Sequence, residues 1–227
     1  MIDFHSHILP DVDHGAATLE ISYRMLQEAK KAGVTKIVAT PHFYPHKDSI
    51  EDFLLRRDRA RAEMSGLLSQ HSELEIEIIY GAEVALDRDL LALDLTKLQI
   101  GNSGTILIEM PLFERWQSWM YDVLYEIESK FSLTVILAHV DRYSKDQVDH
   151  VLDMGFLAQI NAESLVSGSF FEKRRFLKMC KEGRIHLIGS DAHDIQDRTY
   201  RDLILAYKRL PLAILSAFED NADEFLC

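Results

Sequence analysis

Histidines and carboxylates in this 227-residue chain occur at spacings suited to metal binding. His5 and His7 are separated by one residue, and so are Asp191 and His193 near the other end of the chain. Residues i and i+2 of a β-strand face the same side, so each pair can offer two donors to one ion. Further histidines and glutamates complete the candidate ligands, which are His5, His7, His14, His42, Glu83, Glu109, His139, Asp191 and His193.

The candidate donors are six imidazoles and three carboxylates, more than one tetrahedral ion takes. The sequence therefore predicts two or three divalent ions. Because no thiolate belongs to the set, manganese, zinc or iron is favoured over a soft-metal centre. Three carboxylates gathered in one place would be strongly unfavourable without cations, and divalent ions remove that cost.

Short apolar segments rich in β-branched residues alternate with amphipathic segments and predict strands and helices respectively. The first helix is expected between an N-cap at Thr18 and a stop at Gly33. Strands are expected at residues 2–7, 34–40, 75–80, 105–109, 134–139, 156–160 and 185–188. Further helices are expected at residues 50–68, 115–130, 145–154, 171–182, 197–209 and about 211–225.

This alternation predicts about seven parallel βα units in an α/β fold. Every predicted strand carries a candidate ligand or another polar residue, such as Asn161, near its C-terminal end. Barrel enzymes place their active sites at that end, whereas a doubly wound open sheet, the competing architecture, would let fewer of these residues converge. No linker, composition shift or fixed-period repeat interrupts the chain, so one domain over residues 1–227 is expected.

Each candidate ligand also has an ordinary explanation when it is taken alone. A His-x-His pair is often a surface or core pair, His42 could belong to a turn, and Asp191 could lie at the start of a helix. The metal-site prediction therefore depends on the joint placement of these residues at successive strand ends.

Composition and charge narrow the functions open to the chain. Lys and Arg total 25 and Asp and Glu total 37, for a formal net charge of −12, which argues against nucleic acid as a partner. Cys180 and Cys227 form no CxxC pair or disulfide framework, so a reducing compartment, the cytoplasm, is expected. No apolar run approaches the roughly 20 residues of a membrane helix, so no membrane insertion is expected.

Six motifs that carry the candidate ligands resemble those of the polymerase-and-histidinol-phosphatase (PHP) superfamily. They are MIDFHSHILPDVDHG at the start of the chain, TPH ending at His42, GAE ending at Glu83, LIEMP around Glu109, AHVDRY around His139 and SDAH ending at His193. They occur in order over nearly the whole chain. Within the superfamily, the chain most resembles bacterial tyrosine-protein phosphatases of capsule and exopolysaccharide operons.

The resemblance implies a distorted TIM-like (β/α)7 barrel with a trinuclear centre, in which manganese is the expected metal. On the superfamily pattern, the first ion is held by His5, His7, Glu83 and Asp191; the second by Glu83, Glu109 and His139; and the third by His14, His42 and His193. The phosphatase branch often has an aspartate where this chain has His14. Asp13 therefore stays open as the ligand in that loop.

The chemistry expected of such a centre is hydrolysis of a phosphate monoester. Two ions can lower the pKa of a shared water and orient it toward phosphorus. Arg142 and Arg198 follow the last ligands of their strands closely and are candidates to hold the phosphoryl oxygens, with surface salt bridges as the alternative. No acid for the leaving group is evident, which suits a phenol with its pKa near about 10. Phe43 and Tyr44 could flank its ring.

The resemblance thus implies a metal-dependent protein-tyrosine phosphatase whose partner is a phosphotyrosine protein, a bacterial tyrosine kinase of polysaccharide biosynthesis. A small-molecule phosphatase of the histidinol-phosphate type is the nearest alternative. A phosphoesterase acting on nucleic acid is disfavoured by the charge. A non-catalytic, metal-loaded regulatory module is disfavoured because the donor set is complete. A cysteine phosphatase is not indicated, because neither cysteine is followed by the Gly-rich arginine loop of that class.

Overall fold

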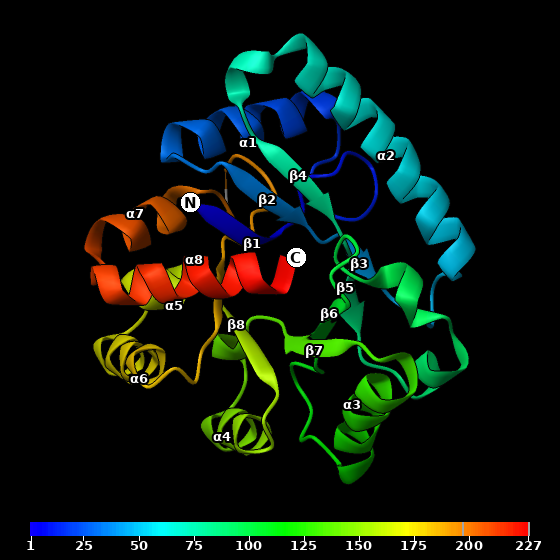
Figure 1. Ribbon diagram of the computed structural model, residues 1–227, viewed down its shortest axis with the longest axis vertical. Helices are drawn as coiled ribbons and strands as arrows, with labels where there is room; N and C mark the ends of the chain where they lie inside the picture. The colour runs from blue at the N-terminus through cyan, green and yellow to red at the C-terminus, as the bar shows by residue number, and fades with distance from the viewer. Residues whose placement is uncertain (197, 227) are drawn as a thin grey trace.

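A curled sheet of parallel strands forms the centre of the computed structural model, which describes residues 1–196 and 198–226 (Figure 1). One part of the sheet has the order β1-β2-β4, and the other has the order β3-β5-β6-β7-β8-β9. All strand pairs in the described part of the chain are parallel, as the βα alternation predicts. The strands are β1 (Ile2–Ser6), β2 (Lys36–Ala39), β3 (His42–Phe43), β4 (Glu77–Tyr80), β5 (Glu83–Ala85), β6 (Thr105–Glu109), β7 (Thr134–Leu137), β8 (Leu157–Asn161) and β9 (Leu187–Gly189).

Two bends carry the backbone from one part of the sheet to the other. β2 is followed by β3 after Pro41, and β4 is followed by β5 after Gly81. Proline cannot donate a ladder hydrogen bond, but the Pro41 carbonyl still accepts one from the Glu83 amide at 3.0 Å. A Cβ on Gly81 would lie 2.9 Å from Cγ1 of Ile100, so this corner has little room for a side chain. The bends place His42 and Glu83 side by side on β3 and β5.

The first and last strands meet to close the curl. The His7 amide donates to the Ala192 carbonyl, and the Asp191 amide donates to the His5 carbonyl, each at 2.8 Å. A Cβ on Gly189 would lie 2.6 Å from Cβ of His5, so the close approach of these strands needs a glycine. The seam brings the two metal-binding motifs from opposite ends of the sequence into contact.

Helices surround the sheet on its outer side. They are α1 (Leu19–Ala32), α2 (Ile50–Gln70), α3 (Ser118–Phe131), α4 (Lys145–Asp153), α5 (Ala162–Val166), α6 (Phe170–Lys181), α7 (Arg201–Arg209) and α8 (Leu212–Leu226). The N-cap at Thr18 and the left-handed Gly33 after α1 are confirmed. Ser144 and Ser169 form capping boxes that start α4 and α6. The predicted start of one helix at position 197 lies outside the described residues, and α7 begins at Arg201.

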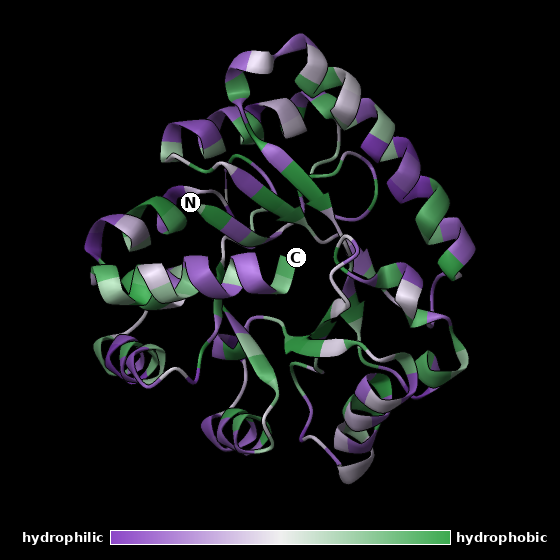
Figure 2. Ribbon diagram, viewed as in Figure 1, coloured by the Kyte–Doolittle hydropathy of each residue, from purple (hydrophilic) through white to green (hydrophobic). Residues whose placement is uncertain are grey.

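Apolar side chains pack on both sides of the sheet. The larger cluster joins the sheet to the helices, and a smaller one fills the inside of the curl with Phe4, Val38, Leu107 and Ile136. α8 lies against the start of β1 and β9, where the Ile2 amide donates to Glu219 at 3.1 Å. Hydrophobic colour follows the strands, while the helices alternate in colour (Figure 2). The core is therefore closed at the end opposite the carboxyl ends of the strands.

The chain is a mixed α/β protein with a curled parallel sheet, consistent with a distorted TIM-like fold. The predicted strands and helices exist, with ends that differ by a few residues. The short helix α5 and several 3-10 turns are additions that the sequence did not predict. In the described part of the chain, none of the helices combines the length and the apolar character needed to span a bilayer.

Candidate metal centre

The side chain of Glu83 lies at the middle of a buried group of imidazoles. Its Oε2 atom lies 3.0 Å from Nδ1 of His42, 3.3 Å from Nε2 of His7 and 3.6 Å from Nε2 of His5. Its Oε1 atom lies 2.7 Å from Nε2 of His139. Burial opposes ionisation of Glu83, but the imidazoles of His5, His42 and His139 outweigh it and hold its pKa well below the usual range. Glu83 is therefore an anion shared by four imidazoles from three strand ends.

Asp191 approaches the same imidazoles from the last strand. Its Oδ1 atom lies 3.3 Å from Nε2 of His5 and 3.3 Å from Nε2 of His7. Asn161 donates to the other oxygen at 3.0 Å. Burial opposes ionisation here too, but the contacts with His5 and His7 hold the pKa of Asp191 well below its usual range. The two His-rich motifs thus meet around two ionised carboxylates.

Several donor atoms at the centre of this cluster are buried without a hydrogen bond to any described residue. They are Nε2 of His5, Nε2 of His7, Nδ1 of His42 and Oε2 of Glu83. Buried polar atoms nearly always have partners, so a set of orphaned donors aimed at one place indicates a missing cation. The residues present therefore fit divalent metal ions.

Neighbouring groups hold the imidazoles in fixed orientations. Nδ1 of His5 lies 2.6 Å from Oγ1 of Thr40, and Nδ1 of His7 lies 2.6 Å from Oδ2 of Asp13. Each of these contacts leaves Nε2 of the ring free for the cluster. Such outer partners fix the tautomer of a ligating histidine and raise its basicity. Thr40 and Asp13 are therefore positioning residues.

Asp13 makes more hydrogen bonds than the contact to His7. Its Oδ2 atom also accepts from the His42 amide at 2.8 Å, and its Oδ1 atom accepts from the Gly15 amide at 2.8 Å. A Cβ on Gly15 would lie 2.3 Å from the His7 carbonyl oxygen, so only glycine fits here. Burial opposes ionisation, but His7 and these amides hold the pKa of Asp13 well below its usual range. Both oxygens are therefore engaged, and Oδ2 ties the loop to His7 and to the start of β3.

His139 and Glu109 close one side of the cluster. Nε2 of His139 lies 3.5 Å from Oε1 of Glu109, in addition to its contact with Glu83. Burial lowers the pKa of His139, but the hydrogen bonds to Glu109 and Glu83 raise it overall to about 9. As a metal ligand, this ring would donate in its neutral form. His139 and Asp191 also have positive φ angles of 33° and 53°, a strained backbone that marks functional positions.

His14, His42 and His193 form the opposite side. The His14 ring stacks on His42 with centroids 4.8 Å apart and lies 4.7 Å from the His193 ring. Burial lowers the pKa of His42 to about 4 and that of His193 to about 3, so both rings are neutral near pH 7 and can donate to a metal. His14 is exposed, at the solvent edge of the centre.

Among the described residues, three compact groups have all their donor atoms within 4.8 Å of one another. They consist of His5, His7 and Glu83; of His42, Glu83 and Glu109; and of His7, His42 and His193. The first belongs to the expected first set. The other two contain His42 where the superfamily pattern has His139, and His7 where it has His14. All nine candidate ligands nevertheless lie in one continuous cluster.

Both candidate arginines reach this cluster from its open side. Arg142 donates from Nη2 to Oδ2 of Asp191, and Nη1 of Arg198 lies 3.6 Å from the same oxygen. The side chain of Arg142 is 26% exposed and that of Arg198 is 46% exposed. Two guanidinium groups thus lie beside the donors and remain open to solvent.

An apolar hollow adjoins Glu109 at the rim of the centre. It has a volume of about 310 Å³, and its lining includes Leu86, Met110 and Phe113 together with Tyr44. Phe113 is 99% exposed. The Tyr44 ring stacks on His42 with centroids 5.0 Å apart. By contrast, Phe43 is fully buried against Phe53, so of the two aromatic residues only Tyr44 can reach a substrate.

Sequence reasoning missed Thr40, Asp3 and the role of Phe113. Asp3 is fully buried and accepts from the Ser190 amide and hydroxyl at 2.7 and 2.6 Å, which ties the first strand to the segment before Asp191. Burial raises its pKa to about 6. The polar residues of the first strand and of the TPH motif could have suggested such partners, but spacing alone does not separate a ligand from its support.

Comparison with known proteins identifies the family. The family model described as "Capsular polysaccharide synthesis, CpsB/CapC" matches residues 1–203, which is most of the chain. The chain belongs to the CpsB/CapC family. The resemblance seen in the motifs is thereby confirmed.

Named relatives of the CpsB/CapC family align over most of their length. The tyrosine-protein phosphatase CpsB of Streptococcus pneumoniae is 31% identical over 218 residues, covering 87% of this chain and 85% of the relative. CpsB of Streptococcus agalactiae is 30% identical over 217 residues, with the same coverage. YwqE of Bacillus subtilis is 27% identical over 210 residues, covering 88% and 80%.

A solved structure shares the fold. It comes from work on YwqE of Bacillus subtilis and CpsB of Streptococcus pneumoniae, described as metal-dependent tyrosine phosphatases. The match has a TM-score of 0.82 at 23% identity and covers 100% of this chain and 94% of that one. The curled parallel sheet is therefore the fold of this CpsB/CapC chain as well.

Proposed function

We propose that this chain is a metal-dependent phosphomonoester hydrolase that acts as a protein-tyrosine phosphatase in capsule or exopolysaccharide synthesis. The observation that carries the proposal is the set of buried, unpartnered donor atoms around Glu83, with two partly exposed arginines beside it. The names of the CpsB/CapC relatives support the same activity.

The centre would hold two or three divalent ions on the nine residues His5, His7, His14, His42, Glu83, Glu109, His139, Asp191 and His193. Nitrogen and carboxylate donors without a thiolate suit manganese, with zinc or iron as alternatives. When bound, such ions activate water for attack on phosphorus and offset the charge of the phosphoryl group.

Protein side chains supply orientation and charge around the phosphate. Arg142 and Arg198 would hold phosphoryl oxygens, because a guanidinium fork matches their geometry and lies at the open side of the cluster. Thr40 and Asp13 keep the rings of His5 and His7 aimed at the centre. No side chain is assigned as an acid for the leaving group, which suits a phenol more than an alcohol.

The apolar hollow beside Glu109 supports an aryl phosphate as the substrate. Leu112 and Phe113 offer the kind of surface that takes a phenyl ring, and Tyr44 lines the same hollow. The exposure of Phe113 leaves room for the rest of a protein substrate. We therefore assign a phosphotyrosine residue of a protein as the substrate, in preference to histidinol phosphate. That protein would be a bacterial tyrosine kinase of capsule or exopolysaccharide synthesis.

The finer description of the fold belongs to this proposal. The nine described strands become seven when β2 and β3 are taken as one bent strand and β4 and β5 as another. Seven strands are the number in a (β/α)7 barrel. A single domain spanning residues 1–227 is proposed with it, because one continuous core joins the sheet and the helices. The buried free thiol of Cys180 supports a reducing location, the cytoplasm, whereas Cys227 lies outside the described residues.

A side-by-side assay tests the proposed activity. The protein, loaded with Mn²⁺, is offered a phosphotyrosine peptide and histidinol phosphate at matched concentrations. The proposal predicts a higher kcat/KM for the phosphotyrosine peptide. A higher value for histidinol phosphate would assign the site to small phosphate esters, and no turnover of either would contradict a phosphatase.

A further inference from the structure

A basic groove lies on the outside of the protein, between α4 and α6, and the metal centre does not explain it. Its volume is about 1060 Å³, larger than the 310 Å³ hollow beside Glu109. The helices α4 and α6 lie next to each other at the lower left of Figure 1. Its lining includes seven cations but only two anions; the cations are Lys145, Lys173, Arg174, Arg175, Lys178, Lys181 and Arg184.

Part of this positive charge is not neutralised within the protein. Lys145 pairs with Asp149, and Lys178 lies 3.6 Å from Glu182. Within residues 1–196 and 198–226, no ion pair is found for Lys173, Arg174, Arg175 or Lys181. A chain with net charge −12 thus keeps four cations without an ion pair at one place.

Arg175 is one of the two half-buried cations among these four. Its Nε and Nη2 atoms are buried and have no hydrogen-bond partner in the described part of the chain. Its guanidinium group lies 4.9 Å from the centroid of the Phe176 ring. Arg175 lines the groove and forms no ion pair in the described part of the chain, so its positive charge is available to an anion that lies there.

The exposed face of α6 combines aromatic and basic side chains in one stripe. Phe171, Arg174, Lys178 and Lys181 follow one another at intervals of three or four residues, so they lie along one side of the helix. All four are exposed, and Phe170 packs edge-on against Phe171 with centroids 5.7 Å apart. Exposed aromatic residues next to arginine are typical of protein-binding surfaces.

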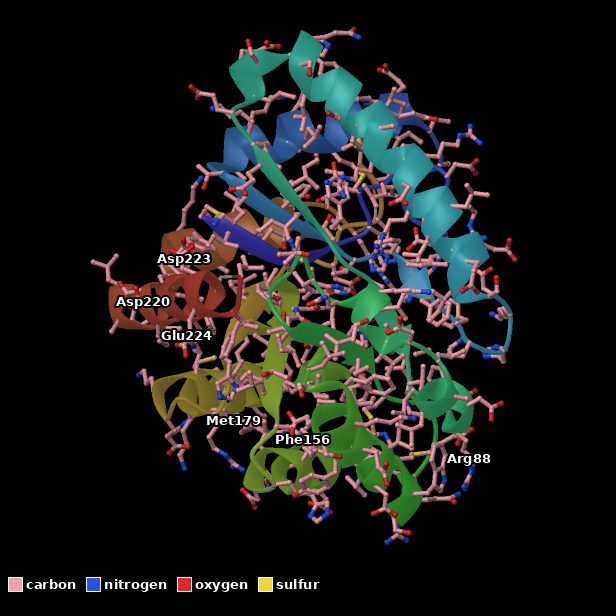
Figure 3. All side chains as sticks on the ribbon, turned by 45° about the vertical axis from the view of Figure 1, so that its right-hand side comes forward. Arg88, Phe156, Met179, Asp220, Asp223 and Glu224 are labelled. Carbon is pink, nitrogen blue, oxygen red and sulfur yellow. The ribbon has the colours of Figure 1, made fainter. Side chains whose placement is uncertain are left out.

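Exposed acidic side chains also gather on another helix, α8. Asp220, Asp223 and Glu224 are exposed on α8, and Figure 3 shows them on the outer side of that helix. Met179 of α6 points to the core instead and is buried. α6 itself carries five basic residues and one acidic residue, Glu172, so its exposed face is mainly basic.

The groove is connected to the catalytic edge of the sheet. Arg142 lies three residues before Lys145, the first residue of α4. The first residue of α6, Phe170, follows Asn161 by nine positions, and Asn161 contacts Asp191. Both helices run back from the carboxyl ends of their strands, so the groove begins at the metal-centre side and leads away from it.

The geometry points to a docking groove for an acidic segment of the protein substrate, and this inference rests on the proposed function. The twelve residues of α6 span about 18 Å, the length of five or six extended residues. Acidic side chains of that segment would meet the cations of the groove, and an apolar one would meet Phe170 and Phe171. The phosphotyrosine of the same chain would then reach the metal centre.

A membrane surface fits these observations less well. A helix that binds in the plane of a membrane buries its apolar face in lipid. The apolar face of α6, with Phe176, Met179 and Cys180, is already buried in the protein core. The cations also line a concave groove rather than a protruding surface. An acidic peptide is therefore the assigned ligand.

Fluorescence anisotropy with a short, unphosphorylated, glutamate-rich peptide containing one phenylalanine tests the groove. Its glutamine counterpart is the reference peptide. Wild-type protein is expected to bind the acidic peptide about tenfold more tightly at about 50 mM salt and to lose this preference at about 500 mM. Arg174→Glu/Lys181→Glu should abolish the preference, because two cations of the groove become anions.

A matched control reverses two exposed lysines elsewhere. Lys31→Glu/Lys208→Glu changes the net charge equally, near the ends of α1 and α7, and should keep the preference. All three proteins should hydrolyse p-nitrophenyl phosphate at the same rate. Absence of p-nitrophenyl phosphate turnover in wild type would refute the proposed function. The anisotropy result would still show whether the groove binds the acidic peptide.

Three results would overturn the docking assignment. One is equal binding of the two peptides by wild type, and another is equal loss of preference in the control. The third is tight binding of vesicles with about one-third phosphatidylserine and no peptide preference, which would assign the face to a membrane. Sedimentation adds a check on the oligomeric state. If wild type is a dimer and Arg174→Glu/Lys181→Glu is a monomer, a second copy of the chain occupies the groove.

Discussion

Asp13 offers a sharp test of how the metal centre is held together. In the structure it accepts three hydrogen bonds, from Nδ1 of His7 and from the amides of His42 and Gly15. Asp13→Ala removes all three hydrogen bonds at once. The ring of His7 would then lose the partner that directs Nε2 toward Glu83 and Asp191.

The size of the effect follows from those contacts. A hydrogen bond to a charged group contributes about 1.5–3 kcal/mol, and removing the outer partner of a ligating histidine typically lowers metal affinity about 10–100-fold. We therefore expect the Mn²⁺ concentration for half-maximal activity of Asp13→Ala to rise about 10–100-fold. The number of ions bound at saturation should not change, because no donor of the centre is lost.

Asp13→Asn refines this prediction. One amide oxygen can still accept from His7 and from the His42 amide, but the NH₂ group would face the Gly15 amide, a donor. Its half-activating Mn²⁺ concentration should lie between those of wild type and Asp13→Ala. Asp11→Asn is the control, because Asp11 is exposed in the same loop and its left-handed backbone suits asparagine.

Mn²⁺ titrations of p-nitrophenyl phosphate turnover, with elemental analysis of each protein at saturation, measure both quantities. A half-activating concentration equal to that of wild type would refute the positioning role of Asp13. Loss of one whole equivalent at saturating Mn²⁺, with no rescue in Asp13→Asn, would instead make Asp13 a ligand.

Further predictions concern the rim of the site. Arg142→Ala should lower kcat/KM by about 10²–10³, for a loss of about 2–4 kcal/mol of transition-state stabilisation, with little change in thermal stability; a wild-type kcat/KM would leave Arg142 only a partner of Asp191. Phe113→Ala should lower kcat/KM for p-nitrophenyl phosphate but not for glycerol 2-phosphate, and an equal loss on both would remove Phe113 from the aryl site. His14→Ala should lose about one metal equivalent and keep measurable activity at high Mn²⁺, whereas unchanged metal content would exclude it as a ligand.

The sequence predicted most elements of the fold because local signals are strong there. Apolar β-branched runs and the caps at Thr18 and Gly33 located strands and helices within a few residues. The bends at Pro41 and Gly81 were not predicted, because each depends on a distant partner, such as Ile100 packed against Gly81. The short pairing of His42 with Glu83 therefore became visible only in three dimensions.

The gathering of the candidate ligands followed from one rule, that the carboxyl ends of parallel strands share an edge. That rule places His5, Glu83 and Asp191 together without any knowledge of distances. It cannot say which neighbour orients a ligand. The contacts of Thr40 and Asp13 depend on loop backbone geometry, and spacing in the sequence does not encode it.

The metal content of purified protein, measured together with p-nitrophenyl phosphate turnover, tests the central claim most directly. Wild type should carry at least two divalent ions per chain, lose turnover with them in EDTA, and regain both with Mn²⁺. Glu83→Gln should lose more than one equivalent and all turnover, because Oε2 of Glu83 faces three imidazoles. Full turnover after EDTA dialysis, with no metal found by elemental analysis, would contradict the account.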